Sequence, residues 1–335
     1  MSEIIVITYP SALDFWLDGT YQFSDQYPYA YRKLADIPND FASPISKEIV
    51  QELSFCLGLN SPISFLVSSE RNRKKSALYQ KISRPKHLPP KSFIKIDSRI
   101  IPALDKYEIF MASPEYCFLC AVKDHSLGQL VEIGTNLCAM YVKDLECSAL
   151  QHPRQPLITQ NLLSKYVAAA CNMPYHRKAM VAVKYVVDNS RSPMESKLAT
   201  ICCLPRKNGG YGIKPPKLNY DIAHSIDSKG IFERNSSNCD FVWPKERIVL
   251  EYDSDMFHAN PEQFAYDKIK YRALTISDYK VFPIVKKDIQ SLDQLDHFFL
   301  LVRSKLGMRN QLSEFKHFRY QREIVYNDLF RSFSK

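Results

Sequence analysis

The sequence lacks any apolar run long enough to cross a membrane, and it opens Met-Ser-Glu-Ile-Ile-Val-Ile, without the basic segment and long apolar stretch of a secretion signal. It also lacks internal repeats and low-complexity segments. A hydrophobic fraction of 45% and a charged fraction of 24% are ordinary for a globular protein, which excludes a fibrous or disordered chain. We therefore expect a soluble, cytoplasmic protein with no membrane partner.

Regularly spaced cysteine pairs are missing as well. The nine cysteines are an odd number with irregular spacing, and most stand among apolar residues, which favours reduced, buried thiols. Cys117 and Cys120 form a Cys-x-x-Cys motif, but no second pair with matching spacing completes a zinc site. Packing in the core is the favoured role for both residues.

The sequence has no Gly-x-x-x-x-Gly-Lys-Ser/Thr motif, so a phosphate-binding loop of that kind is excluded. The glycine-rich stretch at residues 209–212, Gly-Gly-Tyr-Gly, is interpreted as a loop beside a functional site.

At 335 residues the chain exceeds one typical domain. A polar break at residues 188–193 predicts a boundary between a sensing or substrate-selecting domain (1–188) and a second domain (189–310), followed by a helical tail (311–335). The expected class is α/β, because strand-like and helical patterns alternate. In the first domain we expect a short helix from residue 11, a helix that starts at residues 113–115, and a helical stretch over residues 160–187. In the second we expect a helix over 193–203, two strands, a helix over 261–278 and a strand over 281–285.

The formal net charge of +9 favours an anionic partner. Residues 71–95 carry nine Lys or Arg and no Asp or Glu, which would attract phosphates without regard to sequence. A solvated loop explains the same composition equally well. The candidate nucleic-acid contacts are Arg71, Arg73, Lys74, Lys75, Lys81, Arg84 and Lys86.

Two β-rich runs, residues 239–243 and 248–253, flank a four-residue turn with proline and predict a hairpin. If Trp243 pairs with Ile248, Asp240 lies opposite Glu251, and Asp253 follows on the same face. Acidic residues in direct opposition repel, so a cation or a shared proton is expected between them. Mg²⁺ takes one or two carboxylates and leaves room for water and phosphate, which is what phosphodiester hydrolysis requires.

A helix with Ser192-Pro193-x-Glu195, then Asp240, then Glu251-x-Asp253 and then His258 resemble the PD-(D/E)XK endonucleases, and within them the enzymes similar to very-short-patch-repair (Vsr-like) endonucleases. The resemblance covers about residues 190–290. Asp267-x-x-Lys270-x-x-x-Leu274 fits the helix that follows in that family, and Val281–Val285 fits its next core strand. The residues that carry it are Ser192, Pro193, Glu195, Asp240, Glu251, Asp253 and His258.

By this resemblance the second domain has a PD-(D/E)XK (restriction-endonuclease-like) core, and Asp240 and Glu251 bind Mg²⁺, or Mn²⁺, with Glu195 adding a carboxylate. Asp253 stands where the motif often has Lys, so it coordinates metal or orients a hydrated ligand. His258 or Lys270 would then carry protons or contact phosphate. The plainer interpretations are a solvent-facing polar hairpin, a helix-dipole role for Glu195, a surface-loop role for His258, and a helix-surface pair of Asp267 with Lys270.

The opening stretch resembles the regulator-type domain of the AbiEi antitoxins, and proteins with these two parts are implicated in bacterial defence against phage. The expected function is therefore a metal-dependent nuclease acting on DNA or RNA, with a phage or host protein as a possible trigger. A DNA-binding transcriptional regulator with a nuclease-like fold is the first alternative. The second is an interaction protein in which the carboxylates are structural.

Overall fold

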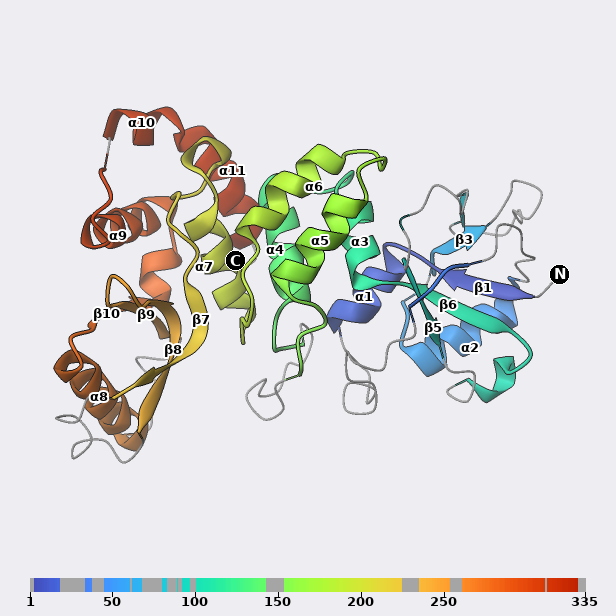
Figure 1. Cartoon of the computed structure of the whole chain (residues 1–335), viewed down its shortest axis with the longest axis horizontal. Coiled ribbons are helices and arrows are strands. Elements are labelled where there is room, and N and C mark those ends of the chain that lie inside the picture. The colour runs from blue at the N-terminus through green and yellow to red at the C-terminus, as the bar shows by residue number, and fades with distance from the viewer. Residues whose placement is uncertain are drawn as a thin grey trace. The chain divides into compact units, whose positions relative to one another are not determined.

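The chain divides into two compact units, residues 1–186 and 187–335 (Figure 1). The division falls two residues before the boundary predicted from the sequence. The computed structural model describes residues 3–18, 34–37, 45–60, 62–67, 80–82, 89, 92–96, 101–142, 154–224, 235–253, 261–310 and 312–330. Both units combine helices with a mixed sheet, so the predicted α/β class is confirmed.

The first unit contains a six-stranded sheet in the order β2-β5-β6-β1-β3-β4. Strands β1 and β6 run parallel at its centre, and both are almost wholly buried, which explains their continuous apolar sequences. The strands are β1 (Ile4–Ile7), β2 (Leu34–Ala35), β3 (Phe65–Val67), β4 (Gln80–Ile82), β5 (Phe93–Ile96) and β6 (Glu108–Ala112).

Six α-helices of the first unit lie in its described residues: α1 (Ser11–Asp18), α2 (Lys47–Leu57), α3 (Pro114–Ala121), α4 (Leu127–Leu137), α5 (Gln160–Ala169) and α6 (His176–Ala182). The predicted starts at 11 and 113–115 are confirmed; the Ser113 hydroxyl caps α3 by accepting from the Tyr116 amide. The prediction of one helical stretch over residues 160–187 was wrong in one respect, because residues 170–175 interrupt it between α5 and α6. Tyr175 adopts a left-handed φ of 61° between α5 and α6.

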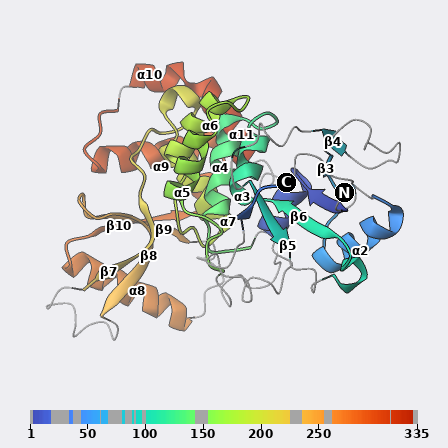
Figure 2. The same cartoon turned by 45° about the vertical axis from the view of Figure 1, so that its right-hand side comes forward.

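The second unit runs helix, three strands, helix, strand, and ends in further helices, seen from two directions in Figure 1 and Figure 2. Its sheet has the order β10-β9-β8-β7, in which β7 to β9 are antiparallel and β10 is parallel to β9. The elements are α7 (Pro193–Cys203), β7 (Lys217–Ala223), β8 (Ser236–Trp243), β9 (Ile248–Asp253), α8 (Pro261–Ile276), β10 (Lys280–Val285), α9 (Leu292–Lys305), α10 (Leu312–His317) and α11 (Arg319–Phe330).

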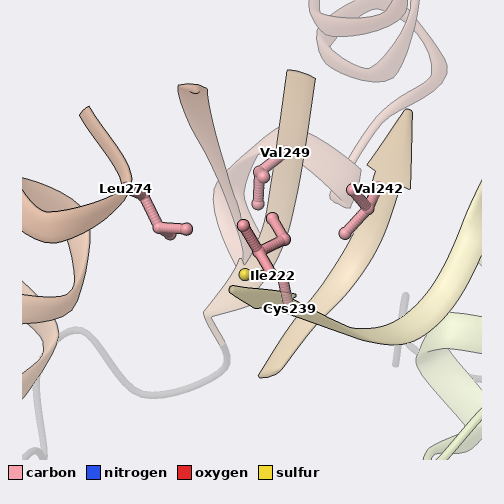
Figure 3. Close-up of a cluster of buried hydrophobic side chains, with 5 residues drawn as sticks. All are labelled: Ile222, Cys239, Val242, Val249 and Leu274. Atoms are coloured by element: carbon pink, nitrogen blue, oxygen red, sulfur yellow. The ribbon is translucent and has the colours of Figure 1, made fainter. Parts of the chain in front are cut away.

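Helix α8 covers one face of this sheet through a compact apolar cluster (Figure 3). Leu274 of α8 packs with side chains of three strands, all at most 3% exposed. Burial of such side chains contributes about 1.5–3 kcal/mol each. The strand members of the cluster are Ile222, Cys239, Val242 and Val249.

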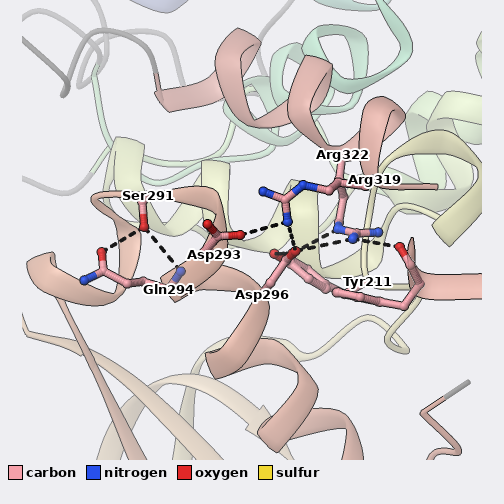
Figure 4. Close-up of polar contacts among 8 residues, drawn as sticks. Tyr211, Ser291, Asp293, Gln294, Asp296, Arg319 and Arg322 are labelled. Carbon is pink, nitrogen blue, oxygen red and sulfur yellow. Dashed lines mark hydrogen bonds and ion pairs between the residues drawn. The ribbon is translucent and has the colours of Figure 1, made fainter. Parts of the chain in front are cut away.

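The glycine-rich turn belongs to the interior of the second unit and has no part in the carboxylate site. Tyr211 is fully buried, and its hydroxyl donates to Asp296 Oδ1 at 2.8 Å (Figure 4). Arg322 of α11 donates to the same oxygen at 2.9 Å. A Cβ on Gly209 would lie 2.3 Å from the Gln321 carbonyl oxygen, so only glycine allows α11 this close. The predicted tail is thus packed into the second unit.

The eight described cysteines are free thiols, and Cys117 is buried. Both residues of the Cys-x-x-Cys motif lie in α3. Among the described helices, none combines the length and the apolar character needed to span a bilayer.

Candidate functional site

The acidic residues predicted to form a site lie where strands β8 and β9 separate. The hairpin has the predicted register, with Phe241 opposite Leu250 and Trp243 opposite Ile248. The ladder ends at Phe241, one residue after Asp240. Beyond the last backbone pair, a side chain links the two strands: Asp240 Oδ2 accepts a hydrogen bond from the backbone N–H of Tyr252 at 2.8 Å. The carboxylate of Asp240 thus reaches across to β9.

The pairing of β7 with β8 is interrupted by one residue pair at this point. Leu218 pairs with Phe241 and Tyr220 with Cys239, but Asn219 and Asp240 between them do not pair. Asn219 adopts a left-handed φ of 48°. Cys239 and Val242 consequently lie in the same apolar cluster although they are three residues apart. Asp240 occupies this interrupted position, and its carboxylate bonds to the backbone of β9.

Glu251 of β9 faces α8. Its Oε1 lies 2.9 Å from Nζ of Lys270, and the two side chains are 10% and 14% exposed. Burial, and then the negative charge of Asp240, raises the pKa of Glu251 to about 7. Burial is the largest single influence on the pKa of Lys270 and lowers it, but the charge of Glu251 and the other neighbouring groups together outweigh burial and raise the pKa. The lysine predicted as a proton carrier or phosphate contact is thus bound to the carboxylate predicted to bind metal.

Glu195 is fixed at the start of α7 by a dense set of hydrogen bonds. Its Oε2 accepts from the Arg191 amide at 2.9 Å and from Asn219 Nδ2 at 2.6 Å, and its Oε1 accepts from the Ser192 hydroxyl at 3.0 Å. Burial and the charge of Asp240 raise the pKa of Glu195 to about 7 in spite of these donors. The capping role and the electrostatic link to Asp240 therefore coexist in one side chain.

Asp240 is the common neighbour of the other two carboxylates, since its charge acts on both Glu195 and Glu251. Burial raises its own pKa, while the Tyr252 amide and the charges of Lys270 and Arg191 oppose the rise. Three acidic groups thus share two basic neighbours in a buried region, which leaves an excess of negative charge.

The donor chemistry of this region fits a hard divalent cation, because two carboxylates can be completed by water and phosphate oxygens. In the described part of the chain, no three His, Cys, Asp or Glu side chains already form a metal-ligand group. Glu195 has both oxygens engaged in hydrogen bonds, so Asp240 and Glu251 are the better-placed ligands.

The other predicted residues are less well defined by the structure. Asp253 is half-buried at the end of β9, and its charge contributes to raising the pKa of Tyr271. Lys81 lies in β4 opposite Leu66 of β3. His258 and the remaining basic candidates lie outside the described residues: Arg71, Arg73, Lys74, Lys75, Arg84 and Lys86.

Sequence reasoning missed several residues of the site. Burial, followed by the charges of Glu251, Asp267, Asp253 and Asp240, raises the pKa of Tyr271, which places this phenol near the carboxylates. Its position next to Lys270 was the available signal. The remaining missed residues are Arg191, Asn219 and Asn238.

Comparison with known proteins adds two bacterial relatives of unassigned role. The chain is 26% identical over 119 residues to uncharacterized protein MT2308 of Mycobacterium tuberculosis strain CDC 1551 / Oshkosh and to uncharacterized protein Rv2248 of strain ATCC 25618 / H37Rv. The match covers 34% of this chain and 39% of each relative. No family model matches the chain, and no solved structure matches it.

Proposed function

We propose that the second unit is a metal-dependent nuclease of the PD-(D/E)XK kind that hydrolyses phosphodiester bonds in DNA or RNA. The observation that supports it best is the convergence of Asp240, Glu251 and Lys270 where β8 and β9 part. A purely structural role explains this arrangement poorly, because burying acids beside one another costs stability unless a cation neutralises them.

In this proposal Asp240 and Glu251 hold Mg²⁺ or Mn²⁺, and Glu195 adds negative charge from α7. The bound ion supplies Lewis acidity, which polarises a phosphoryl oxygen and lowers the pKa of a water molecule. Lys270 favours the ionised form of Glu251 and supplies the positive charge that the family motif places at the position of Asp253. Its ammonium group holds a proton close to the carboxylates, where a leaving oxygen needs one.

The wider setting of the proposal comes from the resemblance alone. A role in bacterial defence against phage, a sensing function of the first unit, and a phage or host protein trigger are therefore proposed together with the nuclease activity. The mycobacterial relatives do not distinguish among substrates.

The test is incubation of the full chain with Mg²⁺ or Mn²⁺ and supercoiled plasmid, single-stranded DNA or transfer RNA. Asp240→Asn is the appropriate variant, because an amide oxygen can still accept from the Tyr252 amide. Asp278→Asn is the matched control, since Asp278 pairs with the exposed Arg247 at the other end of the hairpin. Cleavage by the wild type and the control, and none by the variant, is expected.

Equal cleavage by all three proteins would remove Asp240 from the site. Binding of DNA without cleavage under any metal would instead favour the transcriptional regulator. A melting temperature that does not respond to metal would favour an interaction protein with structural carboxylates.

A further inference from the structure

Arg191 stands next to the carboxylates through two separate anchors. Its backbone N–H donates to Glu195 Oε2 at 2.9 Å, immediately before the N-cap residue of α7. Its guanidinium Nη1 donates to Asn238 Oδ1 at 2.9 Å. Asn238 lies two residues before Asp240 on β8, and the charge of Arg191 is close enough to oppose the rise in the pKa of Asp240.

The amide of Asn238 is itself fixed, which determines how it presents its oxygen. Nδ2 of Asn238 donates to the Asn219 carbonyl at 2.9 Å and to Asp221 Oδ1 at 3.0 Å. Both amide protons are thereby used, and Oδ1 remains for Arg191. The guanidinium is therefore positioned in advance by a chain of hydrogen bonds that starts on β7.

Arg191 differs from three other arginines of the second unit in what it pairs with. Arg247, Arg319 and Arg322 each lie within ion-pair distance of an aspartate. Over the described ranges, Arg191 has no carboxylate at that distance, and its side chain is exposed. A guanidinium has five donors, and Asn238 takes one of them. Among the described residues the guanidinium makes no other hydrogen bond, so several of its donors are unused.

We infer that Arg191 is a catalytic residue of this unit, whose guanidinium binds the non-bridging oxygens of the phosphodiester while it is being cleaved. The inference rests on the proposed function. A planar, permanently charged fork suits two phosphate oxygens, and its proximity to Asp240 puts it at the phosphate that the carboxylates would address. Its contribution grows as negative charge develops in the transition state.

The experiment compares Arg191→Gln and Arg191→Lys with Arg247→Gln in the full chain. Arg247 is the matched control because it is an exposed arginine of the same unit, paired with Asp278 at the far end of the hairpin. Two quantities are measured: the single-turnover cleavage rate on whichever of plasmid, single-stranded DNA or transfer RNA the wild type cuts, and the Mg²⁺ concentration that gives half the rise in melting temperature.

Arg191→Gln should slow cleavage by about 100-fold, the usual loss when one transition-state donor is removed. It should not weaken Mg²⁺ binding, because a positive charge beside Asp240 has been taken away. Arg191→Lys should recover part of the rate, and Arg247→Gln should leave it unchanged.

A merely structural role predicts a different result. If Arg191→Gln lost metal-dependent stabilisation together with activity, Arg191 would be a support for Glu195 and Asp240, and the inference would be overturned. If Arg191→Gln cleaved at the wild-type rate, or if Arg191→Lys recovered none of the lost rate, the inference would also be overturned. The nuclease proposal would still stand. Absence of cleavage by the wild type would count against the proposed function itself.

Discussion

Lys270 Nζ lies 2.9 Å from Glu251 Oε1, and this ion pair joins helix α8 to strand β9. Lys270 and Leu274 are four residues apart and therefore project from the same side of α8. One contacts a carboxylate, and the other packs in the apolar cluster. The helix thus contributes both a charge and a hydrophobic anchor to the same face of the sheet.

Lys270→Met should destabilise the protein by about 3 kcal/mol at pH 8, because Glu251 would remain as a buried charge without its partner. The loss should be smaller at pH 5, where a carboxyl with a pKa of about 7 is protonated. Urea denaturation at both pH values measures the difference. Lys268→Met, at an exposed position of the same helix, is the control. Equal losses at the two pH values would rule out the charge of Glu251 as the cause.

The metal-free protein should lose stability as the pH rises from about 4.5 to about 7. The pKa of both Glu195 and Glu251 is raised from an ordinary 4.5 to about 7 in the folded state, so the folded protein holds more protons than the unfolded chain in this window. Thermal denaturation in EDTA across pH 4.5–8 tests the sign. Glu195→Gln should flatten the dependence, and a stability that instead increased across the window would contradict these pKa shifts.

Asp296→Ala should destabilise the second unit by about 3–5 kcal/mol, because Arg322 is only 1% exposed and would keep an uncompensated charge. Asp293→Ala supplies the comparison, since Asp293 is 68% exposed and pairs with the half-exposed Arg319. That surface pair should contribute less than about 1 kcal/mol. Chemical denaturation of the two variants measures the free energy of unfolding of each. Similar losses would mean that burial of Asp296 does not govern its contribution to stability.

Asn219→Ala should be more destabilising than Asn219→Gly by about 1 kcal/mol. The left-handed backbone conformation at this position is strained for alanine and is adopted by glycine without strain. Both variants lose the hydrogen bond to Glu195, so this contribution cancels between them. Differential scanning calorimetry of the two proteins isolates the backbone term. A less stable glycine variant would show that the left-handed conformation is not maintained.

The part of the site that depends on local sequence could be predicted. Apolar runs on either side of a proline-containing turn define the register of a hairpin, and the pairs from Phe241–Leu250 to Trp243–Ile248 agree with it. Helix 193–203 was predicted with its observed bounds because Ser192, Pro193 and Glu195 form a complete N-terminal signal.

The part that depends on contacts distant in sequence could not be predicted. Strand β7 was missed although residues 217–222 alternate between polar and apolar, and with it were missed Asn219 and the break in pairing between Asn219 and Asp240. Lys270 was expected either to serve the site or to pair with Asp267 on the helix surface. Its contact with Glu251 follows from how α8 packs on the sheet, which no local pattern specifies. The order of the first sheet, with β1 between β6 and β3, is equally non-local.

The placement of Lys270 on α8 has a consequence for how the site is maintained. If α8 lifted from the sheet, the four strands could stay paired while Asp240 and Glu251 lost their nearest ammonium group. The fraction of molecules with a complete set of charges is then governed by the local opening equilibrium of one helix, which is smaller in free energy than global unfolding.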